Sequence, residues 1–293
     1  MLAAVGVTGR QGEKVMLLPY QVDVAVMRRP YANWGLIGFT CLVSAVWLSA
    51  PALGLLLSVE DFRLYQLLTH AFLHADLGHL LGNMFFLYLF GNAVNAKLGH
   101  LPYLGLYLVL ACISGFSWYL WPGHGLYCLG ASGAVMGVAG VFLLYYPFNE
   151  VSVFYWFLYR VGTFHVAAFW VLILYVVLDV IGLLGASSGV AHIAHVAGFS
   201  SGAAVATVLI LRGTVRPVQN EQSLLETFGM TVPRVERERA RSDFERLLSR
   251  PVSPLLPTPL PPRRPVARMG TFPPKSPDQA KPPAPPPGPP AAP

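Results

Sequence analysis

Long apolar stretches separated by short polar ones dominate the first three quarters of the chain. A helix that crosses a bilayer needs about 20 mostly apolar residues. The pattern predicts membrane-spanning helices at about 34–57, 74–94, 101–121, 127–147, 161–184 and 190–211. The sequence therefore predicts an all-α, polytopic membrane protein with a six-helix bundle at residues 33–212.

The composition supports a bilayer environment. Hydrophobic residues make up 54% of the chain and charged residues only 12%, whereas a soluble domain carries about 25% charged residues. The net charge of +6 could indicate nucleic-acid binding. However, the basic residues flank apolar stretches or lie in the tail, and they form no basic patch with interleaved aromatics. We therefore expect the lipid bilayer as partner and no nucleic acid.

The basic residues also predict an orientation. One side of the predicted bundle carries Arg28, Arg29, Lys97, Arg160, Arg212 and Arg216, and the other carries only Arg63. Because lysine and arginine accumulate on the cytoplasmic side, both termini are expected in the cytoplasm. The helices at 74–94, 127–147 and 190–211 would then start at the outer face.

The regions outside the bundle have different compositions. Residues 1–32 contain no apolar core followed by a cleavage site, so we expect a cytoplasmic N-terminal segment there. Residues 213–250 are rich in charge and compatible with one short amphipathic helix. From residue 251 onward 18 of 43 residues are proline, which predicts a disordered tail. A polyproline-binding domain is a candidate partner for this tail, although a solvated tail is the simpler interpretation.

Polar residues occur near the outer ends of three predicted helices. Polar side chains in hydrocarbon are costly and therefore usually mark a functional site. His79 and Asn83 are four residues apart and share one helix face. Ser132 and His195 belong to two other predicted helices. At 1.5 Å per residue, His79, Ser132 and His195 would each lie roughly 7–8 Å deep, which predicts one shared site.

The chemistry of these residue types is coherent. A serine hydroxyl is a weak nucleophile that needs an adjacent base, and histidine titrates near neutral pH. The oxyanion of a tetrahedral intermediate needs hydrogen-bond donors, which His79 and Asn83 could supply beside the Ser132 N–H. The pattern thus predicts Ser132 as nucleophile and His195 as base.

Glycines accompany both of these residues. Gly130 and Gly133 flank Ser132, and Gly198 and Gly202 follow His195 at small-residue spacing. Small residues at such spacing let membrane helices approach closely. We therefore expect these four glycines to pack the site tightly.

Taken together, three motifs resemble those of the rhomboid family of intramembrane serine proteases. They are HLLGN at 79–83, GASG at 130–133 and AHVAGFSSG at 194–202, and the resemblance extends over residues 33–212. It implies a serine endopeptidase with a Ser132–His195 dyad, an acyl-enzyme, and oxyanion stabilisation by His79 and Asn83. It also implies cleavage of single-pass membrane proteins near the extracytoplasmic face, with no cofactor and no metal. Together with the topology it favours residence in a bacterial cytoplasmic membrane.

The chain departs from the family pattern at two places. Tyr65-Gln66 occupies the position of a Trp-Arg pair that is typical before the second helix. Met136 stands four residues after the serine, where many members carry an aromatic that packs under the histidine. The outer loop and the positioning of His195 are therefore the features in which this protein should differ from its relatives.

Other polar residues allow more than one interpretation of their role. His70 and His74 are spaced like metal ligands, but without acidic or histidine partners at suitable spacing they favour a structural role in the outer loop. His192 and His195 lack the glutamate of a zinc-protease motif. Asp179 should lie at a depth similar to that of His195. We consider that it tunes cavity hydration or the titration of His195, and a structural aspartate is the simpler alternative.

Three other functions fit less well. A glutamate-type prenyl-protein peptidase requires paired glutamates in a span, and no predicted span contains a glutamate. Non-enzymatic chaperones or trafficking factors on the same fold generally lack the serine or the histidine, and this chain keeps both. A transporter would need broken helices or internal repeats, for which the sequence gives no sign.

Overall fold

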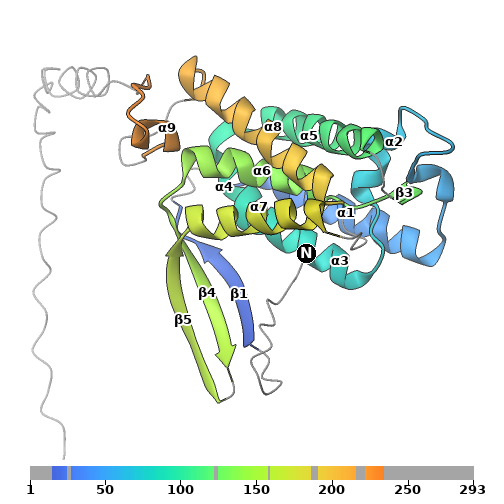
Figure 1. The fold of residues 1–293 in the computed structure, drawn as a ribbon, viewed down its shortest axis with the longest axis horizontal. Coiled ribbons are helices and arrows are strands. Elements are labelled where there is room, and N and C mark those ends of the chain that lie inside the picture. Colours follow the sequence, from blue (N-terminus) through green and yellow to red (C-terminus); the bar gives the residue numbers. More distant parts are fainter. Residues whose placement is uncertain are drawn as a thin grey trace, which may run out of the picture. The chain divides into compact units, whose positions relative to one another are not determined.

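The computed structural model describes residues 15–24, 28–121, 125–157, 159–185, 191–215 and 222–233, most of which are helical (Figure 1). The α-helices are α1 (Tyr31–Ser49), α2 (Gln66–Thr69), α3 (Leu77–Phe86), α4 (Asn92–Leu98), α5 (His100–Leu120), α6 (Ser132–Tyr145), α7 (Ala168–Leu184), α8 (His192–Leu211) and α9 (Leu224–Thr227). Short 3-10 helices are η1 (Leu53–Leu55) and η2 (His70–Phe72), and a π-helical segment η3 (Leu87–Gly91) joins α3 to α4.

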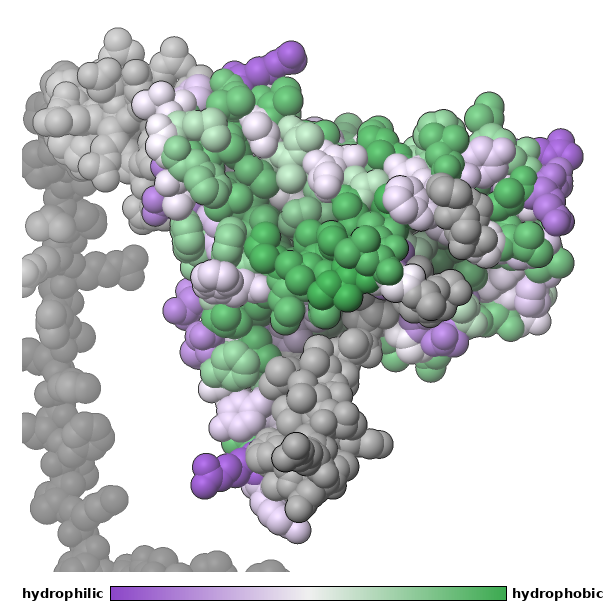
Figure 2. Space-filling model, viewed as in Figure 1, coloured by the Kyte–Doolittle hydropathy of each residue, from purple (hydrophilic) through white to green (hydrophobic). Residues whose placement is uncertain are grey.

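Four helical segments within the described residues are long and apolar enough to cross a bilayer: α1, the continuous Leu77–Leu98 segment, α5 and α8. The helices α6 and α7 are apolar but shorter, with 14 and 17 residues. Apolar side chains cover much of the face seen in Figure 2. The exposed side chains of α7 include Trp170, Leu174, Val177, Leu178, Val180, Ile181 and Leu184. Such a surface suits hydrocarbon and not water.

Helix α6 lies at the centre of the bundle, and all of its residues are buried. It begins at Ser132, so the predicted start near residue 127 is wrong. The preceding strand β3 (Tyr127–Cys128) pairs with β2 (Leu57–Ser58), and Gly130 then turns the chain with φ +122°. The extended entry brings Ser132 to the first helical position. A helix enclosed by other helices also need not expose 20 apolar residues to lipid.

Helices α6 and α8 meet through their backbones. A Cβ atom added to Gly198 would overlap the carbonyl oxygen of Gly133, and one added to Gly202 would overlap that of Gly137. From the other side, a Cβ atom on Gly140 would overlap the carbonyl oxygen of Phe199. Only glycine permits this approach, which holds the N-terminal turns of α6 and α8 together.

A three-stranded antiparallel sheet corrects the all-α prediction. Strands β1 (Val15–Val22), β4 (Glu150–Phe157) and β5 (Arg160–Ala167) are ordered β1-β4-β5. The predicted helix at 161–184 is therefore wrong over its first residues, because α7 begins at Ala168. Residues 151–157 are β-branched and aromatic apart from one serine, which favours a strand. Apolar content alone does not separate such a run from a helix.

Other boundaries differ less from the predictions. Helix α1 ends at Ser49, before Pro51, and not at residue 57. The predicted 74–94 helix extends over Leu77–Leu98, and the Leu87 carbonyl at the start of its π-helical segment accepts a 3.0 Å hydrogen bond from Asn33 Nδ2. Helix α9 is the described helical part of residues 213–250, whereas residues 234–250 and the proline-rich 251–293 lie outside the described residues.

The backbone contact between α6 and α8 predicts that glycine-to-alanine exchanges at two positions affect stability differently. Gly202→Ala should destabilise the protein by about 1–3 kcal/mol, because its methyl group must push α6 away. Gly38→Ala on α1 is the matched control, since nothing lies within 4 Å of a Cβ atom there. It should be neutral or stabilising by about 0.5–1 kcal/mol. Thermal unfolding of both variants in detergent measures the difference, and equal melting temperatures would contradict the packing argument.

Candidate active site

The side chains of Ser132 and His195 are in contact. His195 Nε2 lies 2.7 Å from Ser132 Oγ, a distance typical of a hydrogen bond in which the hydroxyl donates. Ser132 is the first residue of α6 and His195 the fourth residue of α8. Both are buried, with 8% and 3% of their surface exposed. Residues that are 63 positions apart in sequence thus form one polar pair at the helix starts.

The turn before Ser132 is held from two sides. The Gly130 N–H donates to the His70 carbonyl at 2.9 Å, and the Ala131 N–H donates to His74 Nε2 at 3.4 Å. A Cβ atom on Gly130 would lie 2.7 Å from Cε1 of His79. Both the positive φ and this contact therefore require glycine at position 130. The same contact places the His79 ring beside the serine turn.

His70 and His74 have structural partners. His74 Nδ1 lies 2.9 Å from Ser44 Oγ, which donates to the Phe72 carbonyl, so His74 donates through Nδ1 and accepts through Nε2. Burial lowers the pKa of His74 to about 3 and that of His70 to about 4. His70 Nδ1 lies 2.8 Å from the Gln66 carbonyl oxygen. Both rings are therefore neutral at pH 7 and tie the outer loop to the serine turn.

Helix α3 presents the two residues expected at the oxyanion. Asp76 caps this helix by accepting from the His79 N–H at 2.8 Å. Asn83 is 1% exposed. Within the described part of the chain neither Asn83 Oδ1 nor Asn83 Nδ2 has a hydrogen-bond partner. An unpaired buried amide is costly, and this one can donate to a bound polar group.

The N-terminus of α6 supplies further donors. The first intrahelical hydrogen bond to this end runs from the Val135 N–H to the Ala131 carbonyl at 2.9 Å. The N–H groups of Ser132, Gly133 and Ala134 precede it and belong to the first turn, which has no intrahelical acceptors. The positive end of the helix dipole favours a negative charge at this position. An oxyanion formed at Ser132 would be stabilised by this end of the helix.

A carboxylate lies behind His195. Asp179 Oδ1 on α7 is 2.9 Å from His195 Nδ1 and 2.7 Å from His192 Nδ1. The sequence indicated that Asp179 and His195 lie at similar depth but assigned His192 no role. The signal for His192 was its spacing three residues before His195, which places both rings on one face of α8. Among the described residues, these three side chains form one group with the residue types and proximity for holding a metal ion.

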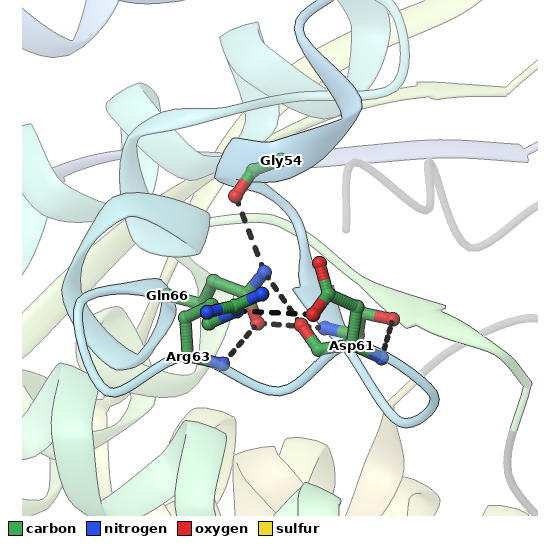
Figure 3. A network of polar contacts seen from close by, with 5 residues as sticks. Gly54, Asp61, Arg63 and Gln66 are labelled. Atoms are coloured by element: carbon green, nitrogen blue, oxygen red, sulfur yellow. Dashed lines mark hydrogen bonds and ion pairs between the residues drawn. The ribbon is translucent and has the colours of Figure 1, made fainter.

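The outer loop carries Tyr65-Gln66 in place of the expected Trp-Arg pair, and Gln66 is buried. Figure 3 shows the polar contacts of Gln66. Gln66 Nε2 donates to the carbonyls of Gly54 and Asp61 at 3.2 and 3.1 Å. Gln66 Oε1 accepts from the N–H groups of Ser58 and Arg63 at 3.3 and 3.0 Å. All four hydrogen-bonding positions of the amide are used. The glutamine thus fastens the loop that carries strand β2, the partner of the strand before Ser132.

The structure is that of a mostly helical, multi-pass membrane protein with a polar site inside it. Its helices are apolar, they pack through glycines, and a buried serine–histidine pair lies at two helix starts. A rhomboid domain model matches residues 61–212, which is just over half of the chain and includes Ser132, His195 and Asp179. The chain belongs to the rhomboid family.

Three relatives match part of the chain. The chain is 37% identical over 81 residues to rhomboid-like protein 11, chloroplastic, of Arabidopsis thaliana, covering 27% of this chain and 29% of the relative. It is 33% identical over 113 residues to RHOMBOID-like protein 12, mitochondrial, of the same plant, covering 31% and 33%. It is 32% identical over 94 residues to "Putative rhomboid protease YdcA" of Bacillus subtilis (strain 168), covering 32% and 47%. The matches thus span less than half of each relative.

The Gln66 network predicts that Gln66→Glu loosens the outer loop. The change removes two donors and turns a carboxylate toward the carbonyls of Gly54 and Asp61, which should cost about 1–3 kcal/mol. Hydrogen–deuterium exchange over residues 53–66 should rise. Asp61→Asn, which breaks only the exposed Asp61–Arg63 ion pair, is the control and should change stability by less than about 1 kcal/mol. Unchanged exchange in Gln66→Glu would show that the amide does not hold the loop.

Proposed function

We propose that this protein is an intramembrane serine endopeptidase that cleaves transmembrane segments of other membrane proteins. The observation that carries the proposal is the 2.7 Å contact between Ser132 Oγ and His195 Nε2. A nucleophile and a base within hydrogen-bond reach are the geometric requirement of covalent catalysis by serine. Membership of the rhomboid family supports the same reaction.

The residues suggest a complete reaction path. Ser132 Oγ attacks the substrate carbonyl carbon while His195 Nε2 takes the hydroxyl proton. The resulting imidazolium returns this proton to the leaving amine, and the peptide C–N bond breaks to leave an acyl-enzyme. Water then attacks the ester carbonyl carbon and gives its proton to His195. The ester C–O bond breaks, His195 returns the proton to Ser132 Oγ, and the second product leaves with a carboxyl group. Catalysis thus needs no cofactor and no metal.

The oxyanion is proposed to lie between α3 and the start of α6. The unpaired Asn83 amide and the His79 ring beside Gly130 are the side-chain donors, and the Ser132 N–H is the backbone donor. Donors aimed at developing charge in a water-poor site are usually a large part of catalysis. Gly130, Gly133, Gly198 and Gly202 act indirectly, because they allow the close packing of this site.

We propose the following placement in the membrane. The helical region 33–212 crosses the bilayer with α1, α3–α4, α5, α6, α7 and α8, and both termini lie in the cytoplasm because of the charge distribution. The segments 1–32, 213–250 and the proline-rich tail 251–293 are then cytoplasmic. Ser132 and His195 lie toward the extracytoplasmic face, which favours single-pass substrates cut near that boundary. A bacterial cytoplasmic membrane fits this arrangement.

A fluorophosphonate probe tests the nucleophile and base directly. The full-length protein in detergent should be labelled at Ser132, Ser132→Ala should abolish labelling, and His195→Ala should slow it by at least about 10³-fold. Ser117→Ala is the control, because this exposed hydroxyl only bonds the Ile113 carbonyl of its own helix. Equal labelling of wild type, Ser132→Ala and His195→Ala would refute the assignment and favour a non-enzymatic relative.

The proposed oxyanion donor predicts a separate effect on turnover. Asn83→Ala should lower kcat for a transmembrane model substrate by about 10²–10³-fold and change KM little, because the donor acts mainly on the transition state. The protein should remain folded, since the Asn83 amide has no partner to lose among the described residues. Asn149→Ala in the turn before β4 is the matched control with unchanged kcat. A rise in KM alone would assign Asn83 to substrate binding instead.

A further inference from the structure

Asp179 is the buried carboxylate of α7. Among the described residues of this helix only Ala168, Leu172 and Asp179 are buried, and Asp179 is 5% exposed. The side chains around it on α7 are apolar and largely exposed. A carboxylate in such a setting is costly unless hydrogen bonds compensate for its lost hydration. The hydrogen-bond partners of Asp179 therefore explain how this carboxylate is tolerated in the apolar bundle.

Two histidines of α8 bind the same carboxylate oxygen. His195 Nδ1 and His192 Nδ1 lie 2.9 and 2.7 Å from Asp179 Oδ1, and both pairs are mostly buried. An ionised carboxylate only accepts, so both imidazoles must carry their proton at Nδ1. His195 then presents an unprotonated Nε2 to Ser132. This is the tautomer that a general base needs.

The ring of His192 also packs directly against the backbone of α7. A Cβ atom on Gly182, three residues after Asp179, would overlap the His192 ring. The carboxylate and the glycine lie on one face of α7, so the ring of His192 is held both by a hydrogen bond and by shape. A fixed His192 in turn restricts Asp179, because the two side chains share Oδ1.

The distances favour hydrogen bonds over a shared metal ion. Nitrogen and oxygen ligands lie about 2.0–2.1 Å from Zn²⁺ in a tetrahedral site, so neighbouring ligands are about 3.3 Å apart. The two nitrogen–oxygen distances of 2.7 and 2.9 Å are shorter than this and typical of N–H···O contacts. A metal would also have to displace both hydrogen-bonded protons.

We propose that Asp179 is a positioning residue that completes a Ser132–His195–Asp179 triad, with His192 as the clamp that holds the carboxylate in place. This inference rests on the proposed function and goes beyond the serine–histidine dyad that the resemblance implies. During acylation the Ser132 proton passes to His195 Nε2, and Asp179 stays ionised and stabilises the imidazolium. The carboxylate keeps the His195 ring oriented through the 2.9 Å contact at Nδ1.

The test is the rate constant for labelling of the full-length protein in detergent by a fluorophosphonate probe, measured from pH 5 to pH 9. Asp179→Asn should lower this rate by about 10- to 100-fold, because the ring loses its orientation and favoured tautomer. The acidic limb of the pH–rate profile should shift to lower pH when the negative charge is removed. The groups that face this pair are His192 and Ser132, with His79 of α3 next in electrostatic reach of His195.

Matched controls separate positioning from general damage. Asp61→Asn removes an equivalent carboxylate in the exposed loop, and His165→Gln removes an exposed imidazole of β5. Both should label like wild type. His192→Gln should slow labelling less than Asp179→Asn, and it carries the test if the melting temperature shows that Asp179→Asn does not fold. Wild-type rates and pH profiles in both Asp179→Asn and His192→Gln would overturn the proposal.

A spectroscopic readout tests the hydrogen bond without reference to proteolysis. In protein labelled with ¹⁵N-histidine, the His195 Nδ1 proton should give a strongly downfield ¹H resonance that disappears in Asp179→Asn. If wild type shows this resonance but no labelling at Ser132, the proposed function fails and the Asp179–His195 contact stands. Absence of the resonance in a wild type that does label overturns the triad alone. Treatment with a chelator should leave both signals unchanged, and a loss restored by Zn²⁺ would replace the triad with a metal site.

Discussion

The backbone contact between α6 and α8 is the constraint on which the site depends. Gly198 and Gly202 of α8 lie against the carbonyls of Gly133 and Gly137, with no space for any side chain between the two helices. Ser132 and His195 extend from the first turns of these helices. Any widening of the crossing would lengthen the 2.7 Å contact between them, so helix packing sets the distance between these two side chains.

The surroundings of this crossing are polar on one side only. Near Ser132 the outer loop is held by neutral histidines and by Gln66, whose hydrogen bonds run to backbone groups and to the Ser44 hydroxyl. The C-terminal part of α6 is enclosed by apolar side chains, and its last residues are as buried as its first. This contrast explains how a polar site can exist inside an apolar bundle. Fixed hydrogen-bond partners at the helix starts offset the free energy of burying its polar groups.

Helix α7 takes part in the site through a few residues. Most of its side chains are exposed and apolar, whereas Asp179 and Gly182 face α8. Its position is therefore tied to His192 and His195 by the carboxylate. This polar link fixes Nδ1 of the His195 ring. The orientation of the His195 ring therefore depends on the position of α7.

The sequence by itself determined that the protein is a mostly helical membrane protein, and it named most residues of the candidate site, because apolar length and the three motifs are local patterns. It located Ser132, His195, His79 and Asn83 and the glycines beside them. Tertiary structure alone decided that residues 160–167 form a strand, since pairing with β4 outweighs their apolar content. It also decided that α6 starts at Ser132 and that His192 and His195 share Asp179. These outcomes depend on contacts between distant segments, which no local pattern contains.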